Sequence, residues 1–238
     1  MTKRSAANRV FLREFFREFH TTGSIVPSSS FLSRSLAKFV IDREDDRPLR
    51  ILEVGPGTGP VTRQIASVMQ DGDLLDLVEI NPEFVRILNE RLTTEPIFQP
   101  VADRIRVLCQ PIEDVEDSQP YDVIISGLPF NNFEGELVES ILRRFEELAR
   151  PSGRLSFFEY VGIRKLKSAV SPGRKTRVRM RGVSAVLERF LQAETSRDTI
   201  LRNVPPAWVH HVQFPATPQD SAGSDETGQA ASTTSSNA

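Results

Sequence analysis

The sequence predicts an α/β fold: a seven-stranded, mostly parallel sheet with an antiparallel C-terminal hairpin and helices on both faces. Short apolar segments alternate with amphipathic ones through most of the chain, and this alternation favours parallel strands that are covered on both sides. The last two apolar segments are separated only by a short turn with Pro205-Pro206. A connection this short makes a hairpin, whose two strands run antiparallel.

The predicted strands are short apolar runs, and the predicted helices have apolar residues at helical spacing. The strands cover residues 50–54, 74–79, 104–108, 121–126, 153–160, 197–203 and 207–214. The helices cover residues 31–42, 58–69, 82–92, 134–149 and 183–192. The chain divides into an N-terminal part, residues 1–45, a main domain, residues 46–214, and a tail, residues 215–238. The tail is rich in small and polar residues, so we expect it to be disordered.

Composition excludes several classes of protein. The single cysteine, Cys109, rules out an internal disulfide framework and suits a reducing cytoplasm; we expect it to fill a buried apolar space. The sequence contains no run of about 18 apolar residues, so no membrane span is expected, and residues 1–7 do not begin a signal peptide. Three histidines and one cysteine give no metal-ligand spacing.

Residues 10–20 predict an aromatic amphipathic helix. Five apolar side chains share one face, and arginines lie towards the other side; the apolar residues are Phe11, Leu12, Phe15, Phe16 and Phe19. A basic, aromatic helix at a terminus can lie in a membrane interface. The plainer interpretation is that its phenylalanines pack on the core of the domain.

Residues 50–60 contain a glycine-rich turn that predicts the binding site. An apolar strand leads to the carboxylate of Glu53, and Gly55, Gly57 and Gly59 follow. Glycine permits left-handed turns and a close approach of backbone to ligand, and the next helix presents unpaired N–H groups at its N-terminus. The turn predicts a nucleotide-like ligand. Its spacing, with the acid before the turn, differs from the Gly-x-Gly-x-x-Gly pattern of dinucleotide sites.

Glu79 ends the next predicted strand. Ligands of open α/β sheets bind at the carboxyl ends of the strands, and a carboxylate at such an end can accept hydrogen bonds from both ribose hydroxyls of an adenosine. A solvated strand end is the plainer interpretation of the same residue. Its spacing from the glycine turn favours the ribose role.

The layout resembles the class I S-adenosylmethionine (SAM) methyltransferases, which have a Rossmann-like fold. The resemblance implies that the amino group of SAM meets Glu53, directly or through water. After the third strand these enzymes usually have an acid, whereas this chain has Gln110 there, so the acid is missing unless Glu113 or Asp114 replaces it. Ile112 is expected to pack on the adenine and to donate its backbone N–H.

The segment Ser126-Gly-Leu-Pro-Phe130 follows the fourth strand and faces the methyl group in the class I fold. We expect Ser126 and Gly127 to lie at the cofactor. The segment resembles the Asn-Leu-Pro-Tyr loop of ribosomal RNA adenine dimethyltransferases, in which the asparagine accepts hydrogen bonds from the target amine. Gly127 stands at that place here, which argues against an adenine N6 substrate.

Three more stretches resemble bacterial phospholipid N-methyltransferases, and with the loop at 126–129 the match covers roughly residues 11–214. The stretches are Thr22-Gly-Ser-Ile-Val-Pro-Ser-Ser29, Glu53-Val-Gly-Pro-Gly-Thr-Gly59 and Arg202-Asn-Val-Pro-Pro206. The resemblance implies stepwise methylation of phosphatidylethanolamine, towards phosphatidylcholine, by a cytoplasmic protein held at the inner face of the cell membrane by an N-terminal helix. Thr22 and Gly23 would belong to a segment, within residues 1–45, that covers the cofactor.

Methyl transfer to an amine requires a neutral nitrogen, so a base or a desolvated site must remove a proton. The candidates are Glu159 and Tyr160, which end the fifth strand. The methylated head group is cationic, and aromatic faces attract such groups. Phe130, Phe133 and Tyr160 are candidates for that role; the alternative is that all three are ordinary core aromatics.

Residues 164–181 carry eight basic side chains and no acidic one: Arg164, Lys165, Lys167, Arg174, Lys175, Arg177, Arg179 and Arg181. Such a stretch attracts an anionic membrane surface. It would also attract RNA phosphates, or it is simply a solvated loop.

These observations predict a SAM-dependent N-methyltransferase that acts on phosphatidylethanolamine or its methylated derivatives at the membrane surface. The expected partners are the phospholipid substrate and an anionic membrane, with nucleic acid less favoured and no metal. An RNA (adenine) or small-molecule methyltransferase is the alternative enzyme. A SAM- or lipid-binding protein without turnover is the alternative from another class.

Overall fold

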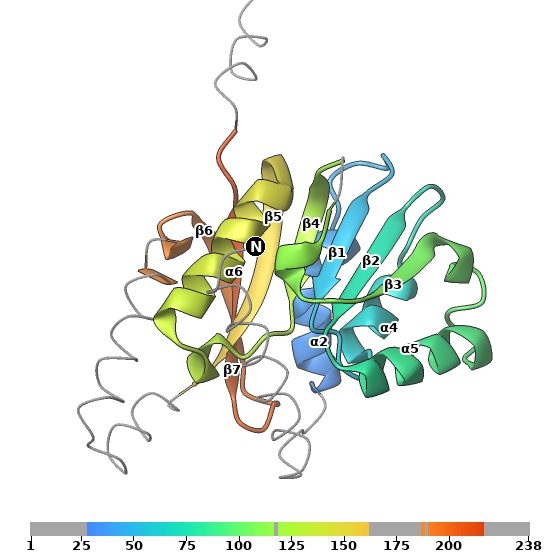
Figure 1. Ribbon diagram of the computed structural model, residues 1–238. Helices are drawn as coiled ribbons and strands as arrows, with labels where there is room; N and C mark the ends of the chain where they lie inside the picture. The colour runs from blue at the N-terminus through green and yellow to red at the C-terminus, as the bar shows by residue number, and fades with distance from the viewer. Residues whose placement is uncertain (1–27, 117–118, 162–186, 189, 217–238) are drawn as a thin grey trace, which may run out of the picture.

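The structure is a computed structural model, and it describes residues 28–116, 119–161, 187–188 and 190–216. A seven-stranded sheet has the order β3-β2-β1-β4-β5-β7-β6 (Figure 1). Strands β1 to β5 are parallel, and β7 runs antiparallel to both of its neighbours, β5 and β6. The strands are β1 Arg50–Val54, β2 Leu74–Glu79, β3 Ile105–Cys109, β4 Tyr121–Ser126, β5 Ala149–Tyr160, β6 Glu194–Ile200 and β7 Ala207–Gln213.

Helices cover both faces of this sheet, and their apolar sides form two core clusters. On one face, α2 and α4 contribute Leu32, Leu36 and Ile65 to a cluster with alternate strand residues. On the other face lies α6. The helices are α2 Ser30–Leu36, α3 Lys38–Ile41, α4 Pro60–Ala66, α5 Pro82–Thr94 and α6 Gly135–Leu148, with 3-10 turns η1 Ala102–Arg104, η2 Ile112–Asp114 and η3 Phe130–Asn132. No helix in these described ranges is long and apolar enough to cross a membrane.

The sequence of α6 explains why it packs as it does. Its buried side chains recur at helical spacing, and they are Leu137, Val138, Ile141, Leu142, Phe145 and Leu148. Each large apolar side chain removed from water contributes about 1.5–3 kcal/mol. This face therefore anchors α6 over β4 and β5, where it supports the loop that follows β4.

The predicted fold class is confirmed, and several predicted boundaries shift. The helix predicted over 31–42 is divided at Ala37 into α2 and α3. The strand predicted over 197–203 ends earlier, at Ile200, because residues 201–206 make the hairpin turn. Half of the predicted helix 183–192 lies outside the described residues, and residues 187, 188, 190 and 191 are helical. Cys109 is exposed rather than buried, because β3 is an edge strand.

Salt bridges fasten the amino ends of the parallel strands. Asp122 is the second residue of β4. Its carboxylate accepts a 2.7 Å hydrogen bond from the backbone N–H of Arg50 and charged hydrogen bonds from Arg47 and Arg150. Burial raises the cost of ionising Asp122, but these donors outweigh it and lower the pKa of the carboxyl. The pair between Arg43 and Asp73 is more deeply buried. These contacts hold the start of the sheet firmly, so it can support a site at the other end.

Candidate functional site

Two turns meet backbone to backbone at the carboxyl ends of β1 and β4. The N–H of Gly127 donates to the carbonyl of Val54 at 2.8 Å, and the N–H of Gly55 donates to the carbonyl of Val78 at 2.9 Å. A Cβ on Gly127 would lie 2.5 Å from the carbonyl oxygen of Gly55, and one on Gly55, at a φ of +71°, would lie 2.7 Å from Leu128. Only glycine permits this packing, which brings the glycine turn and the loop after β4 into one site.

Gly57 borders the open part of the site, and the buried carboxylate of Glu79 lies against its backbone. A Cβ on Gly57 would meet nothing within 4 Å, so space for a ligand lies beside this backbone. The N–H groups of Gly57 and Asn81 donate to the two carboxylate oxygens of Glu79, at 3.1 and 2.9 Å. Burial raises the pKa of Glu79, and these hydrogen bonds counteract the rise. Together with a bond from the backbone of Ile80, they hold the carboxylate against the turn.

Glu53 is buried behind the turn, where the hydroxyl of Thr62 donates to its Oε2 at 2.8 Å. Burial raises the pKa of Glu53 to about 8, hydrogen bonds from Thr62 lower it in part, and the nearby charge of Glu79 adds to the rise. A carboxyl with this pKa is mostly neutral at pH 7. An ammonium group beside it would favour the charged form.

A small cavity of about 20 Å³ joins the ends of the first three strands to the loop after β4. Its walls include Gly55, Glu79 and Ile112, three of the predicted cofactor residues, together with Leu128 and Ile80. Ile112 begins the turn η2 and is buried. The side-chain amide of Gln110, which stands where an acid was expected, donates to the carbonyl of Asp114 at 3.0 Å and so shapes this wall instead.

Aromatic rings in the core support the loop after β4. Ser126 is buried, and its Oγ accepts a hydrogen bond from the N–H of Leu128 at 3.3 Å. Phe130 and Phe133 are fully buried in the core beneath α6, with Phe130 5.6 Å from Phe157 between ring centroids. Neither ring faces solvent, so their placement favours the core interpretation. A role for Phe130 at a cationic head group stays a prediction.

Glu159 lies on the same face of β5 as Phe157, beside a histidine that the sequence did not indicate. Oε2 of Glu159 is 3.5 Å from Nε2 of His210, and Nδ1 of His210 is 2.7 Å from Oε1 of Glu194. The imidazole stacks on Phe157 with 5.0 Å between centroids. Within the described part of the chain, Nε2 of His210 is buried without a hydrogen-bond partner. The histidine therefore stands in a row between two carboxylates, next to the aromatic support of the loop.

Tyr160 lies on the opposite face of the sheet, because successive strand residues alternate. It packs edge-on against Phe158 at 5.0 Å between centroids and is half-buried. Burial raises the pKa of its hydroxyl, so this group stays protonated at neutral pH and is the weaker candidate for a base. The structure separates the two candidate bases rather than bringing them together.

Other predicted site residues lie outside the described residues. They are Thr22 and Gly23, the amphipathic segment 10–19 and the basic stretch 164–181.

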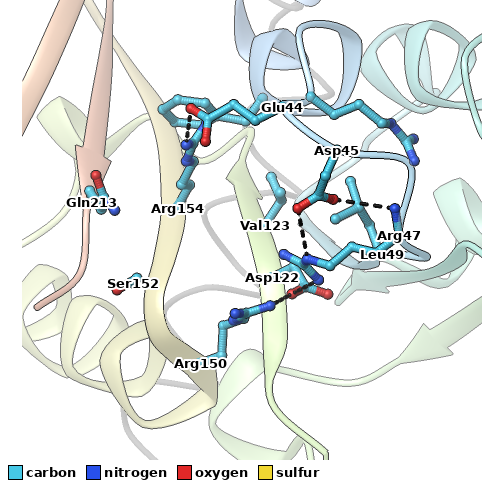
Figure 2. Close-up of a pocket in the computed structure, with 12 residues that line it drawn as sticks. Glu44, Asp45, Arg47, Leu49, Asp122, Val123, Arg150, Ser152, Arg154 and Gln213 are labelled. Carbon is cyan, nitrogen blue, oxygen red and sulfur yellow. Dashed lines mark hydrogen bonds and ion pairs between the residues drawn. The ribbon is translucent and has the colours of Figure 1, made fainter. Parts of the chain in front are cut away.

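A second cavity, of about 240 Å³, lies away from this site (Figure 2). It lies at the amino ends of the strands and is lined by Arg47, Asp122, Arg150 and Arg154 among others. Its arginines are already paired with carboxylates: Arg47 and Arg150 with Asp122, and Arg154 with Glu44. We interpret it as a polar space between structural salt bridges.

The glycine turn, Glu79 and Ile112 lie together at the carboxyl ends of parallel strands, where open α/β sheets bind their ligands. Glu79 suits the ribose of SAM, and Ile112 suits its adenine. The fold and the site thus define a SAM-binding α/β transferase domain. A methyltransferase domain model matches residues 51–153. The chain is 33% identical over 144 residues to the ornithine lipid N-methyltransferase of Singulisphaera acidiphila, a match that covers 60% of this chain and 73% of that protein. The chain belongs to the family of class I SAM-dependent methyltransferases that includes this lipid N-methyltransferase.

Two further similarities bear on the fold. The ribosomal RNA small subunit methyltransferase A of Synechococcus is 30% identical over 109 residues, but the match covers only 42% of this chain and 34% of that protein. The O-methyltransferase TomG from Streptomyces achromogenes, solved in complex with SAM, superposes with a TM-score of 0.57 at 14% identity, covering 87% of this chain and 89% of that one. At this identity the structural likeness concerns the fold alone.

Proposed function

We propose that this SAM-dependent methyltransferase methylates the amine of a lipid head group, phosphatidylethanolamine or its methylated derivatives, at a membrane surface. The observation that carries the proposal is the absence of room at Gly127. An asparagine there would place its Cβ 2.5 Å from the carbonyl of Gly55, so the side chain that receives an adenine amine in the related RNA enzymes has no place. The similarity to a lipid N-methyltransferase supports an aliphatic amine instead.

When bound, SAM would supply an electrophilic methyl group for the acceptor nitrogen, and its sulfur would keep the electron pair of the bond that breaks. The protein must hold the amine in line and receive the proton that the nitrogen loses. Glu159 is our candidate for that base, since β5 carries it two residues beyond Phe157, which is level with the end of β4. His210, between Glu159 and Glu194, would position Glu159 and share the proton.

A direct assay tests this proposal. The protein is incubated with labelled SAM and vesicles that contain phosphatidylethanolamine, and the lipids are separated by thin-layer chromatography. We expect labelled mono-, di- or trimethylated lipid. The Gly55→Asp variant is the control, because its side chain would collide with Leu128, and it should give no product. Unlabelled lipid, together with intact SAM binding by calorimetry, would refute the proposal and favour a SAM-binding protein without turnover.

Methylation of RNA is the second candidate function, because the chain also resembles a ribosomal RNA methyltransferase over 109 residues. Ribosomal RNA supplied in the same assay distinguishes the two. Label in RNA and none in lipid would replace the lipid proposal with this one.

A further inference from the structure

The turn between β6 and β7 presents apolar side chains to solvent at the same end of the sheet as the SAM site. Leu201 and Val204 are 74% and 73% exposed, and Phe31, at the start of α2, is 48% exposed. One other large apolar side chain in the described ranges is exposed, Leu74, at 45%, which begins β2 and so lies at the opposite end. Figure 1 shows the β6–β7 turn and the start of α2 at one end of the sheet.

This turn is firmly attached to α2. The buried amide of Asn203 accepts a 3.1 Å hydrogen bond from the N–H of Ser29 through Oδ1 and donates through Nδ2 to the carbonyl of Pro205 at 2.7 Å. The guanidinium of Arg202 lies 5.1 Å from the centroid of the Phe31 ring. Residues 201, 202, 204 and 31 therefore form one patch, here called the hairpin tip, in a fixed arrangement. Its backbone is held while its apolar side chains remain in water.

We propose that the hairpin tip enters the interface of an anionic lipid bilayer and sets the carboxyl end of the sheet against the membrane. Leu201 and Val204 would lie among the lipid glycerol and upper acyl regions, and Arg202 would meet phosphates at the level of the head groups. A lipid amine is confined to the bilayer surface, so the mouth of the site must face it. This inference rests on the proposed lipid substrate.

A bilayer fits the hairpin tip better than a protein partner does. A stable protein interface needs roughly 800 Å² from each side, and a convex turn with two apolar side chains and one arginine offers much less. A bilayer has no such requirement, because each apolar side chain partitions independently and a nearby cation adds to the attraction.

Tryptophan probes test the location of the hairpin tip. In a Trp208→Phe background, which removes the only tryptophan, Leu201→Trp and Leu74→Trp place one reporter at each end of the sheet. With vesicles of phosphatidylethanolamine and phosphatidylglycerol, we expect the L201W emission to shift to the blue and to be quenched by lipids brominated near the glycerol. The L74W emission should change little. Equal responses of the two probes, or none from L201W, would overturn the inference.

The second measurement separates this inference from the lipid substrate. The Leu201→Ser/Val204→Ser variant should float with vesicles at least about tenfold less well, whereas Leu74→Ser should float normally. Both should bind SAM as the wild type does. With a short-chain phosphatidylethanolamine below its micelle concentration, the tip variant should turn over at the wild-type rate. No turnover by the wild type in that assay would refute the substrate alone. A dimeric wild type that the tip variant makes monomeric would assign the patch to a second copy instead.

Discussion

The carbonyl oxygen of Gly55 occupies the space that any side chain on Gly127 would need, 2.5 Å from the Cβ position. Gly127→Ala must therefore push the two turns apart. We expect a destabilisation of about 1–3 kcal/mol, as in other overpacked sites, and a SAM affinity lower by about tenfold or more. Urea unfolding and calorimetry measure the two effects.

Gly57→Ala is the matched variant for this prediction. Nothing lies within 4 Å of its Cβ, so the cost is confined to placing alanine at a φ of +59°, about 1–2 kcal/mol. It should not alter the spacing of the two turns, so it is the control for the loss of stability alone; its methyl group would enter the ligand space beside Gly57, and SAM affinity is therefore compared between G127A and the wild type. Wild-type SAM binding by G127A would show that the contact between the turns does not shape the site.

Glu53 predicts how stability depends on pH. Its pKa is about 8 in the folded protein against 4.5 ordinarily, so between these values the folded state binds more protons than the unfolded chain. The free energy of unfolding should therefore fall as pH rises from about 4.5 to about 8, and level off above. In Glu53→Gln this contribution disappears. Urea unfolding at several pH values measures it, and parallel curves for the two proteins would contradict the assigned pKa.

The same residue predicts proton release on SAM binding. If the cofactor ammonium meets Glu53, binding favours the carboxylate and expels a proton below pH 8. SAM affinity should rise with pH, by up to about tenfold per unit, from pH 6 to 7.5. Calorimetry in two buffers of different ionisation enthalpy counts the proton, and E53Q should release none.

Much of the site could be predicted because the cues are local. Apolar runs that end in Glu53 and Glu79, with glycines between them, mark strand ends, and parallel strands bring their carboxyl ends to one edge. The structure places Gly55, Glu79 and Ile112 around one cavity accordingly. The sequence also shows glycine at position 127 instead of the asparagine of the RNA enzymes. It does not show that a side chain at this position would have no space.

The rest depends on contacts between distant segments. His210 sits in an apolar strand, and nothing local shows that its neighbours across the sheet are Glu159 and Glu194. The bond between Ser29 and Asn203 joins residues 174 positions apart. The predicted burial of Cys109 is wrong for a related reason: an apolar strand has the same kind of sequence at the edge and at the centre of a sheet.

Asp122 is expected to stabilise the amino end of the sheet. Its folded pKa is lowered, so its contribution is complete above its ordinary pKa of 3.8 and is lost as pH falls through the lowered value. Asp122→Asn should cost about 1–3 kcal/mol at pH 7 because the backbone N–H of Arg50 and two guanidinium groups lose a buried charged partner. Asp45→Asn, which alters an exposed pair with Arg47, should cost at most about 1 kcal/mol. Equal losses in urea unfolding would contradict this account.

The row of Glu159, His210 and Glu194 gives the sharpest test of the chemistry. Glu159→Gln should lower kcat by about 100-fold or more if this carboxylate is the base. His210→Gln should lower kcat less and shift its pH profile, because Glu159 loses the group that positions it and shares its proton, while SAM affinity stays normal. His211→Gln is the matched control: it is a buried neighbour on the other face of β7, bonded to Ser156 at 2.9 Å.

His211→Gln should reduce stability but leave kcat and its pH profile unchanged, because its imidazole does not reach Glu159 across the sheet. The two histidines differ mainly in the face of the sheet on which they lie, so comparing them removes the general cost of altering a buried imidazole. If both variants lose activity in proportion to stability, with unaltered pH profiles, His210 only packs. If H210Q alone shifts the profile, the proton leaves the acceptor amine along the Glu159 side of β5.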